Sequence, residues 1–314
     1  MSTTLILGDL HLDKNFPYTA PESDKALAIT QFKRGILDSL ISSADDIVQT
    51  GDMFDSHDAT GYHLLSALEL FKGKPFTFPL GNHDVSKRRL PSASALLKER
   101  FAYDLPDWEV VDHRLTQELF DAAIQGLTGG EYLVLHCGVG SPQASHENWI
   151  TEAQLEKLSH KYKFIFIGHE HKFQQLHDNV VIVGTPYPVD FGEMYDHYAI
   201  LLNDRGDVEV VKTFDVEKMY SEVDVNDPVV ECRPFLKLVG TVDSANSKHA
   251  FQKLKEIRLH PSTLSVKPAF SVVSQAVQEA KSTQWVDFGE ALKAVMTDDM
   301  RKIYDEIMGD TNEI

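Results

Sequence analysis

Residues 46–52 of the chain read DIVQTGD, an apolar run that ends in glycine and aspartate. A short apolar run of this kind predicts a buried β-strand, and the polar pair marks the loop that follows it. An apolar run that ends in a polar residue recurs at 3–9 (TTLILGD), 75–82 (PFTFPLGN), 131–136 (EYLVLH) and 164–169 (FIFIGH). Helical patterns at 24–42, 62–71 and 151–162 lie between several of these strands. The sequence therefore predicts an α/β fold with helices layered on a mixed pair of sheets.

The pattern changes toward the carboxyl end of the chain. VVIVG (180–184) and HYAILLN (197–203) follow one another closely, which is typical of an antiparallel β meander. An acidic stretch with a proline, SEVDVNDPVVE (221–231), indicates a linker or domain edge. Strands at 235–240 and 263–270 flank a helix at 244–259, which predicts a small β-α-β unit. We expect three parts: 1–215, 216–280, and a helical segment over 281–314 whose apolar positions recur at helical spacing.

Five short polar motifs occur in order, each at the end of a predicted strand. They carry two Asp, one Asn and four His as candidate metal ligands: Asp9, His11, Asp52, Asn82, His136, His169 and His171. Residues two apart on extended backbone point to the same side, so Asp9 and His11, like His169 and His171, can act as pairs. Glycines before Asp52, Asn82 and His169 permit close backbone approach.

The number of candidate ligands indicates two metal ions. Seven ligands are too many for one tetrahedral ion, but they suit two ions of higher coordination that share a ligand. Two divalent ions with two carboxylates leave the site net positive, so it attracts phosphate. The sequence therefore predicts a two-metal site for phosphoryl chemistry.

The set DxH, GDxxD, GNHD, H and GHxH resembles the calcineurin-like metallophosphoesterases, which implies an αββα core. The resemblance implies one ion held by Asp9, His11, Asp52 and His171, and a second held by Asp52, Asn82, His136 and His169. It also implies that His83 protonates the leaving oxygen and that Asp84 orients His83. We expect Asp55 to contact a metal-ligating side chain and orient it. We expect Lys87, Arg88 and Arg89 to bind phosphate.

Within that family, GDMFDS and GNHD resemble the SbcD-type nucleases, and so does GTPYPVDFGE (184–193). Eukaryotic and archaeal relatives usually carry His where Asp55 stands, so the chain follows the bacterial or phage form. The resemblance implies a manganese-dependent DNA exo/endonuclease of repair and recombination; magnesium, iron, zinc or cobalt also suit the ligands. It implies that the β-α-β unit guides DNA and that the last segment docks an SbcC-like coiled-coil ATPase. A homodimer is also expected.

Charge and composition limit these expectations. With 30 Lys and Arg against 48 Asp and Glu, the net charge of −18 disfavours a polyanionic partner, unless metal ions or another subunit supply positive charge. There is no long apolar run or secretory leader, and only two cysteines occur, so we expect a cytoplasmic protein without membrane contact. Two alternatives remain: a phosphodiesterase for cyclic nucleotides or dinucleotides, and a scaffold without catalysis.

Overall fold

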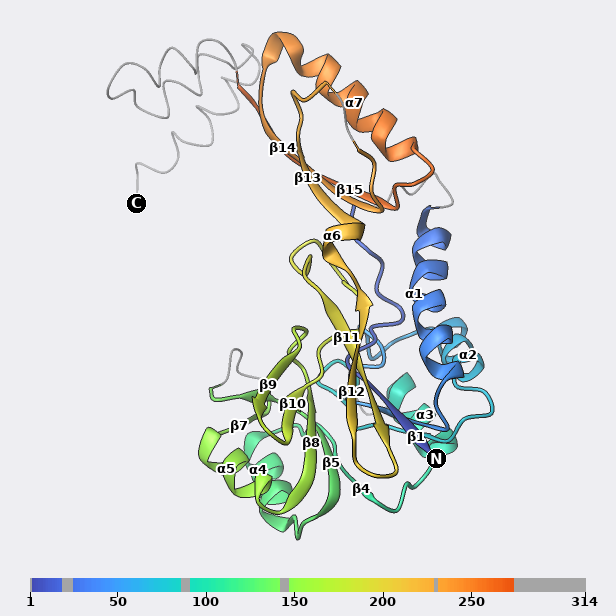
Figure 1. Ribbon diagram of the computed structural model, residues 1–314, viewed down its shortest axis with the longest axis vertical. Helices are drawn as coiled ribbons and strands as arrows, with labels where there is room; N and C mark the ends of the chain where they lie inside the picture. Colours follow the sequence, from blue (N-terminus) through green and yellow to red (C-terminus); the bar gives the residue numbers. More distant parts are fainter. Residues whose placement is uncertain (1, 19–24, 86–90, 142–146, 229–230, 274–314) are drawn as a thin grey trace, which may run out of the picture. The chain divides into compact units, whose positions relative to one another are not determined.

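The computed structural model describes residues 2–18, 25–85, 91–141, 147–228 and 231–273. Within it the chain divides into two compact units, the first covering Met1–Met219 and the second beginning at Tyr220 (Figure 1). Lys87, Arg88 and Arg89 lie outside the described residues, as does the expected helical segment over 281–314.

The first unit contains two five-stranded sheets. In the first sheet the strand order is β12-β11-β1-β2-β3, with β1, β2 and β3 parallel and the other two strands antiparallel to their neighbours. In the second sheet the order is β4-β5-β8-β10-β9, and only β9 is antiparallel. The strands of the first sheet are β1 (Thr3–Leu7), β2 (Asp46–Gln49), β3 (Phe76–Thr77), β11 (His197–Asn203) and β12 (Val208–Phe214). Those of the second sheet are β4 (Trp108–Val111), β5 (Gly130–His136), β8 (Tyr162–Gly168), β9 (Gln174–His177) and β10 (Val180–Ile182).

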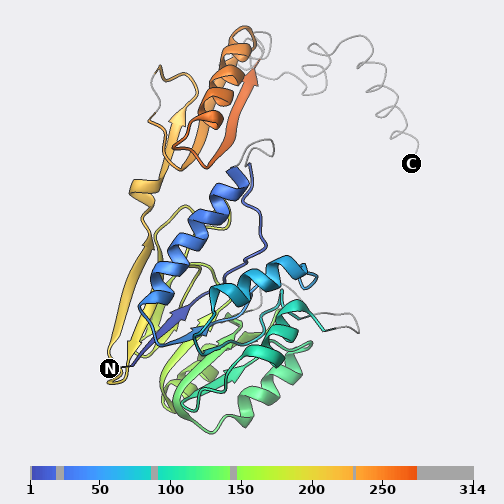
Figure 2. The same cartoon turned by 90° about the vertical axis from the view of Figure 1, so that its right-hand side faces the viewer.

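Three apolar layers hold the first unit together. Between the sheets, buried Ile6 and Val48 of the first sheet pack with Val134 and Phe166 of the second. Helices α1 (Lys25–Ser42), α2 (Gly61–Leu70) and α3 (Ala93–Phe101) cover the outer face of the first sheet. Helices α4 (Gln117–Gly126) and α5 (Glu152–Ser159) cover the second sheet (Figure 2). The result is the αββα arrangement, as expected from the sequence. The unit also contains the short parallel pair β6 (Gly138–Val139) and β7 (Trp149–Ile150), and ends in α6 (Val216–Met219).

The expected meander near residues 180–203 is wrong. Strand β10 pairs in parallel with β8, whereas β11 lies in the other sheet and pairs antiparallel with β1. The two strands look like neighbours in the sequence because the segment between them is short. That segment, 184–196, instead passes from one sheet to the other, and its contacts are described below.

Over its described residues, the second unit is a small parallel sheet with helix α7 packed on it. Its strand order is β13-β14-β15, and α7 connects β14 to β15 as the expected β-α-β unit. Leu254 and Ile257 of the helix pack on Leu236 and Val266 of the sheet. The expected linker is wrong over 221–224, because residues 220–224 form β13, which pairs with β14. The elements are β13 (Tyr220–Asp224), β14 (Phe235–Asp243), α7 (Ser247–Leu259) and β15 (Ser265–Val273). None of the helices in the described ranges is both long and apolar enough to cross a membrane.

Helix α1 buries a cation, Lys33, whose exposed fraction is 7%. Its Nζ donates to the Lys14 carbonyl at 3.1 Å and lies 5.1 Å from the centre of the Tyr187 ring. Burial, together with the nearby charge of Lys14, lowers the pKa of Lys33 from 10.5 to about 8. A buried ammonium is costly when its partners do not replace the lost hydration.

We expect Lys33→Met to stabilise the protein at pH 7. The folded state holds the Lys33 proton less tightly than the unfolded chain, so the charge lowers stability below pH 8. This cost disappears as the pH rises from about 8 through 10.5. The gain at pH 7 is at most about 3 kcal/mol, and it should shrink toward pH 10.5 in thermal unfolding of both proteins. A lower melting temperature at pH 7 would show that the contacts of Lys33 outweigh its desolvation.

Candidate metal centre

The predicted ligands all lie at the carboxyl ends of strands. Those ends face one edge of the paired sheets, where α/β folds place their sites. Asp9 and His11 follow β1, Asp52 follows β2, Asn82 follows β3, His136 ends β5, and His169 and His171 follow β8. The distances below show that this edge brings all of them together.

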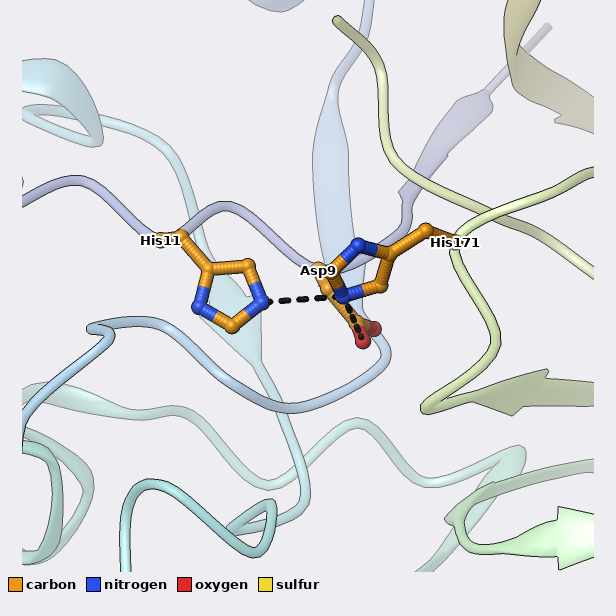
Figure 3. A group of neighbouring side chains, drawn as sticks. All are labelled: Asp9, His11 and His171. Carbon is orange, nitrogen blue, oxygen red and sulfur yellow. Dashed lines mark hydrogen bonds and ion pairs between the residues drawn. The ribbon is translucent and has the colours of Figure 1, made fainter. Parts of the chain in front are cut away.

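The first group consists of Asp9, His11 and His171 (Figure 3). The Nε2 atoms of His11 and His171 lie 3.1 Å apart, and the Nε2 of His171 lies 3.8 Å from Asp9 Oδ2. One potential ligand atom from each side chain lies within 4.8 Å of the other two. The three residues are thus close enough to bind one ion.

The partners behind the two rings show that this group fits a cation. The Nδ1 of His171 donates to Glu193 Oε1 at 2.5 Å, and the Nδ1 of His11 lies 3.4 Å from Asp55 Oδ1. Carboxylates at both Nδ1 atoms favour the Nδ1–H tautomer, which leaves a lone pair on each Nε2. Two lone pairs that face each other at 3.1 Å repel unless a proton or cation lies between them. A divalent ion satisfies both.

The second group is formed by Asp52, Asn82, His136 and His169. The Nδ1 of His136 donates to the Thr50 carbonyl at 2.9 Å, so its Nε2 is the ring nitrogen that can bind an ion once it has lost its proton. That Nε2 lies 2.9 Å from Asn82 Oδ1 and 3.4 Å from Asp52 Oδ2. The Nδ1 of His169 lies 3.0 Å from the same Asn82 oxygen. Several potential ligand atoms again converge, as a second ion requires.

The backbone at the site adopts unusual conformations. Asp52, His11 and His169 have φ of 52°, 42° and 102°, in the left-handed region that residues other than glycine rarely occupy. Close approach explains the glycines of the motifs. A Cβ at Gly51 would lie 2.3 Å from His136 Nδ1, and a Cβ at Gly81 would lie 2.1 Å from Asp52 Oδ1. The site thus depends on a packed, strained backbone.

Burial and charge shift the pKa values of these ligands strongly. Burial raises the pKa of Asp9 to about 7 and lowers those of His11 and His169 to about 3 and 4. Burial alone would raise the pKa of Asp52 and lower that of His136, but their mutual attraction reverses both effects. The pKa of His136 is therefore raised to about 10 and that of Asp52 lies below its usual range. Two positive ions would replace the protons that such a cluster otherwise retains.

His83 lies beside the first group. Its ring centre is 5.2 Å from that of His11, and its backbone N–H donates to Asp52 Oδ1 at 2.9 Å. Its Nδ1 donates to the backbone carbonyl of Asp55 at 2.7 Å, which leaves Nε2 as the atom that can exchange a proton with a substrate. This geometry suits the proton donor that the resemblance implies.

Asp84 does not take the orienting place expected for it. Its buried carboxylate accepts hydrogen bonds from the backbone N–H groups of Gly81, Met53 and Phe54, and from the Ser94 hydroxyl. Burial raises the pKa of Asp84 to about 6. The oxygen that orients His83 is instead the backbone carbonyl of Asp55, while Asp84 holds together the loops after β2 and β3.

The Asp55 side chain lies close to the predicted ligand His11. Its Oδ1 is 3.4 Å from His11 Nδ1 and 3.1 Å from Lys14 Nζ. Glu193 and Thr50, which make equivalent contacts with His171 and His136, were not expected from the sequence. Glu193 ends the GTPYPVDFGE string, so the string itself was the available signal; nothing distinguishes Thr50, which acts through its backbone.

Residues 2–173 match the family model described as Calcineurin-like phosphoesterase. The chain belongs to this family. The match covers the segments that carry all seven candidate ligands and His83, and the family catalyses metal-dependent hydrolysis of phosphoesters. The chain is therefore a metal-dependent phosphoesterase by family. A search of curated proteins found no match.

Proposed function

We propose that the protein is a metal-dependent DNA nuclease that works as a subunit of an SbcCD-like complex. Membership of the family implies phosphoester hydrolysis. The resemblance of GDMFDS, GNHD and GTPYPVDFGE to SbcD-type nucleases favours DNA phosphodiesters as the substrate. His83 also favours a substrate with a poor leaving group, because a proton donor helps most when an alkoxide departs.

The residues divide the chemistry between them. Asp9, His11 and His171, with Asp52, would hold one ion; Asn82, His136 and His169, again with Asp52, would hold the other. We propose that both ions are manganese. When bound, such divalent ions would polarise the phosphoryl oxygens and lower the pKa of a bound water toward ~7. His83 Nε2 donates a proton to the departing sugar oxygen, and the Asp55 carbonyl keeps its ring in place.

The observation that best supports a nucleic-acid substrate is the distribution of charge along the chain. Residues 1–219 contain 19 Lys or Arg and 33 Asp or Glu, whereas residues 220–273 contain seven and six. The acidity that disfavours DNA is thus absent from residues 220–273, whereas residues 274–314 again contain more acidic than basic residues, nine against four. A polyanion can contact residues 220–273 without the repulsion that the acidic parts of the chain impose. This supports a DNA-guiding role for them.

We expect the full chain to degrade linear duplex DNA or nick circular single-stranded DNA with Mn²⁺, and to do neither with a chelator. Bis-p-nitrophenyl phosphate reports whether the metal centre is active. Hydrolysis of this ester without any cleavage of DNA, over a range of salt concentrations, would contradict the nuclease proposal while preserving the family activity.

One observation favours a second candidate. The strongly acidic unit that holds the metal centre suits a small phosphodiester, such as a cyclic nucleotide or dinucleotide, better than a long polyanion. Chromatography of such compounds after incubation with the Mn²⁺-loaded protein tests this directly. Turnover of a cyclic dinucleotide with no DNA cleavage would select this alternative.

Association with an SbcC-like ATPase and with a second copy of the chain are further parts of the proposal. The apolar positions at helical spacing within 281–314 support an ATPase contact through that segment. Exposed Leu27 on α1, and Tyr62 and Leu65 on α2, are apolar side chains whose burial against a second copy would favour self-association. Sedimentation of the purified chain distinguishes a monomer from a dimer.

A further inference from the structure

The segment 184–193, here called the support segment, runs between β10 and β11 and contacts two ligand motifs. It begins at Gly184, whose φ of +73° brings its backbone against residues 171–173. A Cβ at this position would lie 2.7 Å from the His171 carbonyl and 2.7 Å from the Phe173 nitrogen. The backbone is therefore packed directly against the loop that carries His171.

The support segment holds His171 by its backbone and by its ring. The Thr185 N–H donates to the His171 carbonyl at 2.9 Å, and Glu193 Oε1 accepts from the ring Nδ1 at 2.5 Å. These contacts fix both the position of the residue and the direction of its Nε2. A carboxylate behind a histidine also increases the basicity of the ligating nitrogen.

The same segment holds the loop that carries Asp9 and His11. Tyr187 is fully buried, and its hydroxyl donates to the Leu10 carbonyl at 2.7 Å. Leu10 stands between the two ligands, so this hydrogen bond fixes the peptide that connects them. One short segment thus contacts His171 directly and the backbone of Leu10, which lies between Asp9 and His11.

Glu193 is itself held in place. Its Oε2 accepts from the Val189 N–H at 2.9 Å, and its backbone carbonyl accepts from His197 Nε2 at 2.9 Å. The Thr185 hydroxyl lies 2.8 Å from the other nitrogen of the His197 ring. His197 therefore ties the two ends of the support segment together, and Glu193 has little freedom to turn away from His171.

We propose that Glu193 and Tyr187 are positioning residues for one of the two ions, the one bound by Asp9, His11 and His171. The second group has a different support, since the Nδ1 of His136 donates to the Thr50 carbonyl. Loss of Glu193 should therefore weaken one binding event and leave the other. The proposal rests on the metal centre and not on a DNA substrate, so metal binding alone tests it.

The test is calorimetric titration of the full-length, metal-free protein with Mn²⁺. We expect two binding events in the unaltered protein. Glu193→Gln should weaken one of them by roughly 10–100-fold, the usual cost of losing the partner behind a metal-ligating histidine. Tyr187→Phe should weaken the same event to a smaller extent. Unchanged affinities in both variants would overturn the proposal.

Glu170→Gln is the matched control. Glu170 stands between His169 and His171, but its Oε2 accepts from Gln174 Nε2 at 2.8 Å. This variant removes the same charge close to the same ligands and leaves the His171 contact intact. We expect it to change the affinity for Mn²⁺ much less than Glu193→Gln does. An equal loss in both variants would show that general charge, and not positioning, is responsible.

A second measurement does not depend on how well the variants fold. Nitrogen-15 NMR of the unaltered, metal-free protein, at a pH where the rings are neutral, reports which nitrogen of His171 carries the proton. We expect the Nδ1–H tautomer, because Glu193 accepts that proton. The Nε2–H tautomer would overturn the proposal.

Discussion

With DNA, the proposed substrate, His83→Asn should lower cleavage by roughly 10²–10⁴-fold while the protein keeps both ions. His83 is not among the predicted ligands, and its Nδ1 is occupied by the Asp55 carbonyl, so its Nε2 is the group that is lost. A sugar alkoxide is a poor leaving group and needs a proton as it departs. Gel assays of DNA cleavage and elemental analysis of bound metal measure the two effects.

Hydrolysis of bis-p-nitrophenyl phosphate is the control reaction for this variant. Its p-nitrophenolate leaves without a proton, so His83→Asn should reduce its hydrolysis much less than DNA cleavage. Equal losses on both substrates would reject the proton-donor role and indicate that His83 positions the metals or the phosphate. His63→Asn is a suitable comparison variant, because His63 lies on α2 and its Nδ1 is hydrogen-bonded to the Thr60 hydroxyl and not to a predicted ligand.

The sequence was sufficient to predict that the candidate ligands lie together, because each one follows an apolar strand. In a parallel sheet the strand ends meet at one edge, so Asp52 after β2 and Asn82 after β3 could be placed together without knowing the fold. Strands β5 and β8 belong to the other sheet, yet His136 and His169 reach the same centre because the two sheets pack face to face. Short motifs at strand ends are therefore informative even across sheets.

The supporting contacts could not be predicted in the same way. Asp84 follows His83 in sequence, which suggested a side-chain contact, but adjacent residues in a turn point in different directions. The oxygen that orients His83 comes from the backbone of Asp55, and a backbone oxygen leaves no mark in a sequence. Glu193 reaches His171 only because 184–196 crosses between sheets, and the expected antiparallel meander hid that path.

Asp52→Ala should abolish activity and weaken both ions, beyond the 10–100-fold loss that follows removal of a supporting residue. Asp52 is almost fully buried; its Oδ2 lies 3.4 Å from His136 Nε2 of the second group, and its Oδ1 accepts the backbone N–H of His83. The resemblance makes it the ligand shared by both ions. Its removal also leaves the two ions with less negative charge between them. Calorimetric titration with Mn²⁺ measures the loss, and a variant that binds two ions with normal affinity would exclude a bridging role.

Excess metal should not rescue Asp52→Ala. The Asp52 carboxylate also accepts the backbone N–H of His83 at 2.9 Å, so the variant loses the anchor of the proposed proton donor as well as a ligand. At Mn²⁺ concentrations that refill the sites, we therefore expect DNA cleavage to stay low. Asp58→Ala is the matched control, since this exposed aspartate lies on the same loop and pairs with His57. Full recovery of DNA cleavage at high Mn²⁺ would mean that Asp52 serves the ions alone and that the position of His83 does not depend on it.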